Sequence, residues 1–560
     1  MRKYIFILLA SLCTTLSAQA TADGKNKTKS DAHLDAQQYL EILGASMQTL
    51  QQHFVDSIDW ARVLRAGIDA MLMELDPYTQ FYSEADQNEY KQMTTGEYAG
   101  IGSIIQQRGD TVVISEPYEN MPAALSGLQV GDRILAIDGE NMIQKTTSDV
   151  SSRLKGQPNT NFHLKVLRPY VGEMEFDITR KQIVLEAVTF HGWLNDTIAY
   201  IQLNQFTDKA ATGMQSALMA LREDESHQLK GLVLDLRSNP GGLLDEAVKI
   251  VGMFVPKGSM VVETRARQSD WNSTYRTNTQ PIEPELPMVV MVNRSSASAS
   301  EIVSGALQDL DRAVILGERS FGKGLVQSSR PLPYNTLVKF TSAKYYIPSG
   351  RCVQAIDYQA RRMARWEQNQ DESIDLGRIP DSLTHVFYTA AGREVRDGGG
   401  IKPDVELKPD LMSNFTYVLD REYILFDYCT KYCFEHQNNR PITGKGSFVT
   451  DEEMDDFDAF VKSNLRDTIV KVLKLEVEHD LDSLRSELRE RLEEELAQRY
   501  DYQKGIIRQA LLTDKWSHEA ADLLADKQKY EAILASPKKS ADTSKGRKES
   551  SKKDKSKKSK

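Results

Sequence analysis

An alternation of apolar runs and helical stretches between residues 190 and 350 places the strongest constraint on how this chain folds. Four short, mainly apolar runs indicate strands buried on both faces of a sheet, at residues 199–203, 231–236, 288–292 and 313–317. Stretches of helical periodicity follow several of these runs. Parallel sheets produce this pattern because a helix returns the chain to the same edge before each new strand. We therefore expect an α/β core built on a mostly parallel sheet.

The segments on either side of this core have different periodicities. Residues 34–85 place apolar side chains at helical spacing and end at Leu75-Asp76-Pro77. From about residue 97 the chain changes to short β-like runs separated by glycines, with one helical stretch at 147–154. After residue 410 helical spacing returns with a high density of charges, which favours a solvated helical appendage. A length of 560 residues accommodates these segments as domains of a mixed α+β and α/β protein.

The first residues of the chain have the pattern of an export signal. Residues 1–20 combine Arg2 and Lys3, an apolar run to Leu12 and the sequence Ala18-Gln19-Ala20, which together are typical of a cleaved secretory signal. The apolar run is shorter than the roughly 20 residues that a membrane-spanning helix needs, and Leu12 does not suit lipidation of Cys13. We expect an exported protein that is located in the periplasm, within the cell envelope.

Charge is distributed unevenly along the sequence. The whole chain carries a net charge of −10, yet residues 538–560 hold 11 Lys or Arg and only three acidic residues. The body of the chain is therefore acidic, which makes nucleic acid an unfavourable partner. Residues 537–560 are expected to form a disordered Lys/Ser-rich tail, with association to an anionic envelope surface as the alternative to an inert tail.

Three cysteines remain after residue 20, too few for a disulfide framework. Cys429 and Cys433 share one face of a predicted helix, where we expect small buried hydrophobic residues, with a disulfide as the alternative. Only His436 lies near them as a further ligand, so no metal site is predicted.

A glycine-rich turn, Gly100-Ile101-Gly102-Ser103, precedes an apolar strand-like run. Glycine lets the backbone fold closely around an anion, so that successive N–H groups can hold a carboxylate. Taken alone, the turn is equally consistent with an ordinary hairpin. If the turn holds the C-terminal carboxylate of a peptide, Ile101, Ile104 and Ile105 are expected to shape a pocket for the apolar last side chain of that peptide.

The predicted strand that begins at Gly231 ends in Ser238-Asn239-Pro240-Gly241-Gly242, and a helical stretch from 244 to 254 follows. Two glycines between the carboxyl end of a strand and the start of a helix expose N–H groups to a negatively charged oxygen. A phosphate-binding loop or a plain turn is the alternative, but the Gly-Lys-Ser/Thr sequel of a Walker motif is missing.

The strand at 288–292 leads into Ser295-Ser296-Ala297-Ser298-Ala299-Ser300-Glu301 and a helix through Leu310. Small residues leave space for a substrate backbone, and the start of a helix offers aligned amides to a developing oxyanion. Ser298 and Glu301 also have the spacing of a capping box, which accounts for both residues without any catalysis.

Lys323 lies between two glycines in an apolar neighbourhood. A desolvated lysine has a lowered pKa, and its neutral amine can accept a proton from a serine hydroxyl. Gln327, four residues later, is expected to share a face with Lys323 and to orient the amine by a hydrogen bond. A surface lysine in a glycine-rich hairpin is the alternative for this segment alone.

Together these segments resemble the carboxyl-terminal processing peptidases, the tail-specific serine proteases of family S41. The resemblance covers about residues 35–410 and rests on several motifs in the family's order: Leu75-Asp76-Pro77, Asn239–Gly242, Ser296–Glu301, Phe321–Gln327, Gly392–Glu394 and Gly400–Val405. Residues 97–168 resemble a PDZ domain, since a second characteristic stretch, Gly131–Gly139, follows the first glycine turn.

The resemblance implies a domain order. It comprises a signal peptide at 1–20, a helical N-terminal region at 21–96, a PDZ domain at 97–180, an S41 core of the ClpP/crotonase-like α/β type at 181–410, a helical C-terminal region at 411–536 and the tail at 537–560. The region 411–536 has no assigned counterpart in the family.

The resemblance also implies roles for single residues. Ser298 is the expected nucleophile, Lys323 its general base and Gln327 the residue that orients the base. The family places the serine 25 residues before the lysine, which selects Ser298 among the neighbouring serines. The expected oxyanion hole combines the N–H of Ala299 with that of Gly241 or Gly242.

For the PDZ domain, the resemblance implies that Gly100, Ile101, Gly102 and Ser103 hold the C-terminal carboxylate of a substrate. Ser103 departs from the family, in which an apolar residue is common at this position. No metal or cofactor is implied.

The expected function is therefore that of an exported serine endopeptidase acting on proteins or peptides with free C termini. Formation of a homo-oligomer stays open. The competing function is that of a non-catalytic PDZ scaffold that binds C termini, and a different hydrolase on the same core has no evident use for the carboxylate loop.

Overall fold

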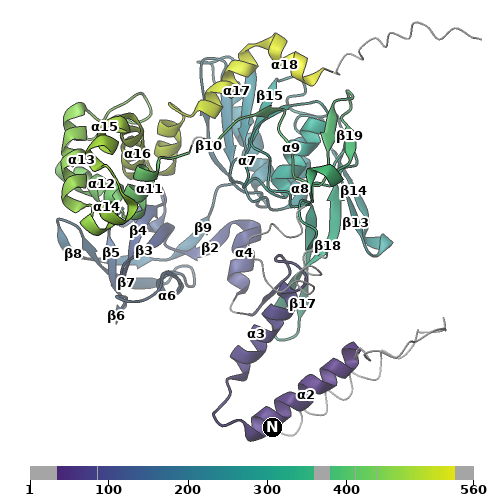
Figure 1. Cartoon of the computed structure of the whole chain (residues 1–560), viewed down its shortest axis with the longest axis horizontal. Helices are drawn as coiled ribbons and strands as arrows, with labels where there is room; N and C mark the ends of the chain where they lie inside the picture. The colour runs from purple at the N-terminus through teal and green to yellow at the C-terminus, as the bar shows by residue number, and fades with distance from the viewer. Residues whose placement is uncertain (1–34, 85, 359–378, 410, 438, 536–560) are drawn as a thin grey trace, which may run out of the picture. The chain divides into compact units, whose positions relative to one another are not determined.

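The computed structural model describes residues 35–84, 86–358, 379–409, 411–437 and 439–535 (Figure 1). The expected signal peptide and Lys/Ser-rich tail lie outside these residues. The chain divides into two compact units, residues 1–68 and 69–560. Within the described residues, no helix is both long and apolar enough to cross a membrane.

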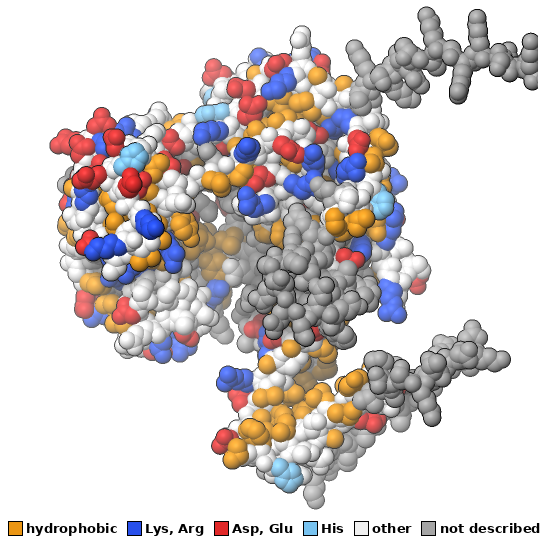
Figure 2. Space-filling model, viewed as in Figure 1, with side chains coloured by type: hydrophobic (Ala, Val, Ile, Leu, Met, Phe, Trp, Pro, Cys, Tyr) orange, Lys and Arg blue, Asp and Glu red, His pale blue; other side chains and the backbone are white. Residues whose placement is uncertain are grey.

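The first unit contains α2 (Ala36–His53) and the start of α3 (Trp60–Met73). A reciprocal cap begins α2, because the Gln38 amide donates to Asp35 Oδ1 and the Asp35 amide donates to Gln38 Oε1, both at 2.9 Å. Several large apolar side chains of α2 are exposed, and Figure 2 shows them along the helix. These two helices form the helical lead-in that the apolar spacing predicts.

An antiparallel sheet forms the small β domain. Its strands lie in the order β3 (Ser103–Arg108), β4 (Thr111–Pro117), β5 (Arg133–Ile137), β7 (Asn161–Arg168) and β8 (Gly172–Thr179), with the short β6 (Glu140–Asn141) on β5. Two helices, α5 (Pro122–Leu125) and α6 (Thr147–Leu154), pack with the sheet around a core that includes Val112, Ile134 and Leu164. At the two ends of the domain, β2 (Glu97–Gly100) pairs with β9 (Lys181–Val184).

The expected α/β core is present as a six-stranded sheet. Its strand order is β10 (Val188–Trp193), β11 (Ile198–Leu203), β12 (Gly231–Asp235), β15 (Met288–Val292), β16 (Val314–Gly317) and β21 (Val405–Glu406). Only β10 is antiparallel to its neighbour, and the four following pairs are parallel. The prediction of a mostly parallel sheet is therefore confirmed.

Helices cover both faces of this sheet, since side chains alternate between the faces along each strand. Leu232 and Leu234 of β12 belong to a core cluster with α7 (Ala210–Glu223), α8 (Leu244–Val251) and α9 (Ala299–Asp309). The intervening Val233 belongs to a second cluster with α17 (Lys515–Ala525) and α18 (Lys527–Leu534), which lie beside the sheet in Figure 1.

A second sheet packs against this core and carries the N-terminal segment of the second unit. It contains β1 (Gln80–Tyr82), β18 (Thr336–Tyr346), β13 (Met260–Ala266) and β14 (Ser273–Arg276) in that order, with β17 (Leu325–Leu332) also paired with β18. The short elements around it are α4 (Gln87–Thr95), β19 (Val386–Tyr388), β20 (Glu394–Arg396) and the 3₁₀ turns Ser269–Trp271 and Asp381–Leu383. Because Phe81 pairs with Val338, the turn before β1 is brought to the core.

The C-terminal helical region is not the solvated appendage that its charge density suggests. Its first six helices are α11 (Asn414–Arg421), α12 (Ile424–Glu435), α13 (Asp451–Asn464), α14 (Asp467–Leu473), α15 (Val477–Ser483) and α16 (Arg485–Ala510), and they enclose a hydrophobic core of their own. Leu425, Phe457 and Leu492 are fully buried in it. Cys429 is also buried there, and both Cys429 and Cys433 are free thiols. The region is a packed domain because its apolar stripes are wide enough to bury, whatever the charge of the opposite faces.

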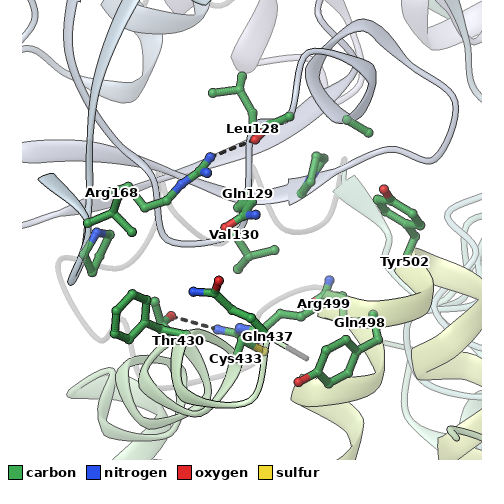
Figure 3. A pocket seen from close by; sticks show the side chains of 17 residues that line it. Leu128, Gln129, Val130, Arg168, Thr430, Cys433, Gln437, Gln498, Arg499 and Tyr502 are labelled. Atoms are coloured by element: carbon green, nitrogen blue, oxygen red, sulfur yellow. Dashed lines mark hydrogen bonds between the residues drawn. The ribbon is translucent and has the colours of Figure 1, made fainter. Parts of the chain in front are cut away.

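The helical domain contacts the β domain at the end of β3. The Arg108 guanidinium donates to both oxygens of Asp427, at 2.7 and 2.8 Å, and lies over the ring of Tyr423 at 4.3 Å. The two domains also line a cavity of about 610 Å³, with Leu128 and Val130 on one side and Cys433 and Tyr502 on the other (Figure 3). The α16 backbone leaves helical geometry at Asp501 and Tyr502, before the chain continues to the core sheet.

Candidate active site

The turn between β15 and α9 holds the predicted nucleophile. Ser298 has φ +56° and ψ −112°, a backbone conformation that side-chain-bearing residues seldom adopt. Strain of this kind persists only where the surrounding structure imposes it, and it is frequent at functional sites. Ser298 lines a cavity of about 640 Å³ at the start of α9.

The neighbouring serines have other roles. The Ser296 hydroxyl is buried and donates to the Leu236 carbonyl at 2.8 Å, and the Ser300 hydroxyl is buried and donates to the Asn239 carbonyl at 3.0 Å. These two bonds fasten the turn to the end of β12. Only Ser298 of the three lines the cavity.

The glycine turn after β12 packs directly against Ser298. A Cβ atom at Gly241, where φ is +99°, would lie 2.8 Å from Ser298 Cβ and 2.9 Å from Ala299 N. A Cβ atom at Gly242 would lie 2.3 Å from the Phe206 carbonyl oxygen. Both positions therefore require glycine, because a side chain at Gly241 would collide with the Ser298 turn and one at Gly242 with the Phe206 backbone.

Hydrogen bonding distinguishes the amides of the two glycines. The Gly241 N–H donates to Asn239 Oδ1 at 2.9 Å, while the Asn239 side-chain nitrogen donates to the Leu203 carbonyl at 2.6 Å. Within the described part of the chain, the N–H groups of Gly242 and Ala299 donate to no protein acceptor. Ala299 is the first residue of α9, whose dipole adds positive potential at this point.

Lys323 lies in the loop between β16 and β17 and lines the same cavity. Burial lowers the pKa of Lys323 to about 8, and the nearby charge of Lys339 acts in the same direction. Glu301 and Asp76 oppose this shift because their negative charges favour the ammonium form. Such a pKa leaves about a tenth of the amine neutral at pH 7.

The spacing of Gln327 suggests that it shares a strand or helix with Lys323, but in the structure the two residues do not belong to one element. Lys323 precedes β17, and a bulge between Val326 and Gln327 interrupts the strand. The Gln327 side-chain nitrogen donates to Thr341 Oγ1 at 3.5 Å. Among the described residues, no hydrogen bond joins Lys323 Nζ to Gln327 or to Ser298, so the orienting role of Gln327 stays a prediction.

Glu301 connects the nucleophile turn to the lysine loop. Its carboxylate is fully buried and accepts from the Ser298 amide at 2.9 Å, the Lys323 amide at 2.8 Å, the Gly322 amide at 2.7 Å and the Ser320 hydroxyl at 2.6 Å. Burial raises the pKa of Glu301, and these hydrogen bonds counteract the increase. The capping-box spacing accounts for the Ser298 amide bond alone, so the sequence does not reveal that Glu301 also organises the lysine loop.

A second residue group that the sequence analysis does not assign to the site is the turn before β1. The Leu75-Asp76-Pro77 motif was the available signal, and it places Tyr78 over the lysine: Lys323 Nζ lies 4.3 Å from the centroid of the Tyr78 ring. The lining of the cavity is mixed, with apolar side chains such as Leu244, Ile302 and Leu325 and polar ones such as Gln327, Arg330 and Lys339. Among the described residues, no group of three or more His, Cys, Asp or Glu side chains is arranged to hold a metal ion.

The glycine turn of the β domain lies between β2 and β3. Gly102 has φ +70°, and its carbonyl accepts from the Tyr118 amide at 2.9 Å. Ile101 is buried and Ile105 packs on the domain core, whereas Ile104 is 42% exposed, so the expected isoleucine pocket stays a prediction. Ile104 points the other way because successive residues of a strand face opposite sides.

Among the residues that the structure describes, β3 is an edge strand of its sheet, and no strand pairs with the other side of its backbone. The α6 helix lies beside β3, where the Thr147 hydroxyl donates to the Gln107 side-chain carbonyl at 3.3 Å. An edge strand next to a helix is the arrangement to which a peptide adds as a further strand.

Comparison with known proteins identifies three family models within the chain. Residues 197–360 match peptidase family S41, residues 113–168 match the PDZ domain, and residues 464–524 match the C-terminal helical domain of probable PDZ-proteases. The last match gives the helical region, which the sequence analysis leaves unassigned, a family counterpart.

Relatives of known name agree with these matches. A carboxy-terminal-processing protease of Bartonella bacilliformis is 33% identical, over 63% of this chain and 81% of that protein. A probable CtpA-like serine protease of Staphylococcus haemolyticus is 29% identical, over 66% of this chain and 74% of that protein. Among solved structures, the photosystem II D1 C-terminal processing protease is 26% identical, with a TM-score of 0.36, over 66% of this chain and 88% of that one. This chain belongs to the carboxy-terminal-processing serine proteases of peptidase family S41.

Proposed function

We propose that this chain is an exported serine endopeptidase that recognises protein C termini through its PDZ domain and cleaves peptide bonds with Ser298 and Lys323. The observation that carries the proposal is the composition of one cavity. It combines the Ser298 hydroxyl, a lysine whose pKa is lowered to about 8 and the Gly242 amide. The buried Ala299 amide follows Ser298 at the start of α9, and neither amide has a protein acceptor within the described residues.

The proposed reaction uses each of these groups in turn. The neutral Lys323 amine accepts the hydroxyl proton as Ser298 Oγ attacks the peptide carbonyl carbon. The oxyanion accepts hydrogen bonds from the Ala299 and Gly242 amides, supported by the α9 dipole. The Lys323 ammonium then protonates the leaving amine, and the resulting neutral amine activates a water molecule that hydrolyses the acyl-enzyme.

The PDZ domain supplies substrate recognition in this proposal. The N–H groups of the Gly100–Ser103 turn receive the terminal carboxylate, and the preceding residues pair with the edge of β3 before Gln107, whose carbonyl already accepts from the Tyr423 hydroxyl at 3.0 Å. Unfolded or C-terminally flexible proteins are the expected partners, since a folded C terminus cannot extend along a strand edge.

Export is a separate part of the proposal and rests on residues 1–20. Fractionation of cells that produce the full chain, with N-terminal sequencing of the product, tests it. A mature protein that begins at Thr21 in the periplasmic fraction supports export, and an unprocessed cytoplasmic chain contradicts it.

The central experiment measures cleavage of an unfolded reporter with a free apolar C terminus and of the same reporter with an amidated C terminus. The mature chain is compared with Ser298→Ala, with Lys323→Met and with the control Ser295→Ala, which changes an exposed serine of the same turn. We expect the wild type and the control to cleave the free-ended reporter, the amidated form to be cleaved more slowly, and the two active-site variants to be inactive although folded.

Two outcomes contradict the proposal in different ways. Cleavage by Ser298→Ala at the wild-type rate excludes Ser298 as the nucleophile. Binding of the free tail by the wild type without any cleavage favours the PDZ scaffold function instead.

A further inference from the structure

Among the described residues, none forms a hydrogen bond with the Lys323 amine. The amine nevertheless lies next to one particular side chain, that of Tyr78. The turn before β1 brings Tyr78 to the amine, with Lys323 Nζ 4.3 Å from the ring centroid. A cation over an aromatic face at this distance is attracted by the ring's negative quadrupole, and more strongly where water is excluded. The contact therefore holds the charged amine in one place.

The turn that carries Tyr78 is itself held firmly. The buried Asp76 carboxylate accepts from the amides of Tyr78 and Thr79, both at 2.9 Å, and from the Thr79 hydroxyl at 3.0 Å. The Thr79 hydroxyl in turn accepts from the Thr341 amide of β18 at 3.3 Å. The same Thr341 carries the hydroxyl that binds Gln327, so the turn is connected to the strand next to the site.

The Tyr78 ring is also fixed from its far end. The Tyr358 hydroxyl donates to the Tyr78 hydroxyl at 3.2 Å, and the two rings meet edge to face with centroids 5.9 Å apart. Burial and the contact with Tyr358 raise the pKa of Tyr78, so the phenol stays neutral and acts on Lys323 through its ring face.

The charged side chains around Lys323 do not hold its amine in the way that the Tyr78 ring does. Lys339 repels the ammonium, while Glu301 and Asp76 attract it. Both carboxylates are buried and already accept several hydrogen bonds, as described above. The ring face of Tyr78 is thus the neighbour that meets the amine directly.

We propose that Tyr78 is a positioning residue for Lys323: the ring face of Tyr78 holds the Lys323 amine in the cavity beside Ser298 between proton transfers. This inference rests on the proposed function of Lys323 as the general base. Tyr78 touches neither the substrate carbonyl nor the nucleophile in this role, and it acts only through the lysine. The N-terminal segment of the second unit thereby completes the active site of the core.

Two substitutions separate the ring from the hydroxyl. Tyr78→Phe keeps the aromatic face and loses only the hydrogen bond with Tyr358, whereas Tyr78→Leu keeps an apolar side chain and loses the ring with its quadrupole. Without the quadrupole the ammonium form of Lys323 is less stable, and its pKa falls. The matched control is Tyr334→Leu, since Tyr334 is 93% exposed on the turn between β17 and β18.

The primary measurement is the pH dependence of kcat/KM on the free-ended reporter. The wild-type rate is expected to rise with pH to a midpoint near 8, where Lys323 loses its proton. Tyr78→Phe and Tyr334→Leu are expected to keep this midpoint, and Tyr78→Leu to move it to lower pH by about half a unit to one unit. A merely structural role for Tyr78 lowers the rate without moving the midpoint.

A second readout does not depend on activity. In the Ser298→Ala background, the Lys323 side-chain carbon signal is assigned by its loss in Lys323→Met and titrated by NMR in each Tyr78 variant. An unchanged titration midpoint in Tyr78→Leu, or an equal shift in Tyr78→Phe, overturns the inference. Should Lys323→Met retain cleavage, the proposed function fails instead, and the NMR titration still decides the role of Tyr78. If Tyr78→Leu does not fold, Tyr78→Met serves as the non-aromatic variant.

Discussion

Removal of the Lys323 amine is expected to stabilise the protein while it abolishes catalysis. The pKa of this lysine falls from 10.5 to about 8 on folding, chiefly through burial. A lowered lysine pKa means that the folded state releases a proton which the unfolded state still binds between these two pH values. Wild-type stability therefore rises with pH across this window, and the ammonium form is the destabilising one.

The magnitude follows from the same two values. A difference of 2.5 between the pKa values corresponds to about 3 kcal/mol at pH 7. Lys323→Met removes this destabilising contribution of the ammonium group and replaces the lysine with an apolar side chain of similar length. Loss of the contact with Tyr78 offsets about 1 kcal/mol of the gain. We expect Lys323→Met to be about 2 kcal/mol more stable than the wild type at pH 7, and by pH 9.5 the pKa-dependent term falls to about 1 kcal/mol.

Hydrogen exchange of the buried amides of β15 and β16 measures this difference, because a chain of several domains does not unfold in one step. Both proteins carry Ser298→Ala so that self-cleavage does not interfere. The control is Lys257→Met, which changes an exposed lysine and is expected to leave the exchange rates unchanged. Equal protection of Lys323→Met and its parent at pH 7, or a difference that does not shrink with pH, refutes the reasoning.

Three further substitutions test the packing around the site and between domains. Gly241→Ala is expected to lower kcat/KM about 100-fold, because the added carbon displaces Ser298 and the Ala299 amide. Gly258→Ala controls for backbone strain, because Gly258 also has a positive φ but open space around it, and an equal loss of activity in both variants argues against the contact between Gly241 and Ser298 as the cause. Glu301→Gln leaves at least one buried N–H without an acceptor and is expected to reduce core stability by about 1–3 kcal/mol, measured by hydrogen exchange of the same β15 and β16 amides, together with activity. Unchanged stability means that the two loops are held by other contacts. Arg108→Met leaves the Asp427 carboxylate unpaired and is expected to loosen the PDZ domain from the helical domain, which accelerates trypsin cleavage at the ends of the PDZ domain; an unchanged digestion pattern excludes this ion pair as the link.

The elements of the core follow from local patterns, and the sequence predicts them well. The runs at 288–292 and 147–154 have the bounds of β15 and α6, because complete apolar burial and a capped amphipathic turn leave clear signals over short distances. The same local reasoning fails for residues 411–536, where high charge density hides six helices that enclose their own core. Charge reports the solvent-facing side of a helix, and only packing shows how much of the other side is buried.

Within the site, the spacing of the motifs identifies which residues take part, but it does not show which of them form hydrogen bonds or lie on the same strand. The sequence analysis singles out Ser298, Lys323 and the two glycines, but it does not distinguish the Gly241 amide from that of Gly242. The bond from Gly241 to Asn239 makes that distinction in the folded chain. Likewise, the spacing of Gln327 suggests one regular element shared with Lys323, whereas in the structure Lys323 precedes β17 and the two residues line the same cavity from different segments.

The sequence by itself determined the domain order, the parallel sheet and the chemical groups of the site, because these depend on periodicity and on residues close together along the chain. Tertiary structure alone decided that Glu301 joins the serine turn to the lysine loop and that Tyr78 covers Lys323. These contacts connect residues that are 19 to 245 positions apart in the sequence. The conformational preferences of neighbouring residues do not predict these contacts, because they form only when β1 pairs with β18 and when the serine turn and the lysine loop both bind the buried Glu301 carboxylate.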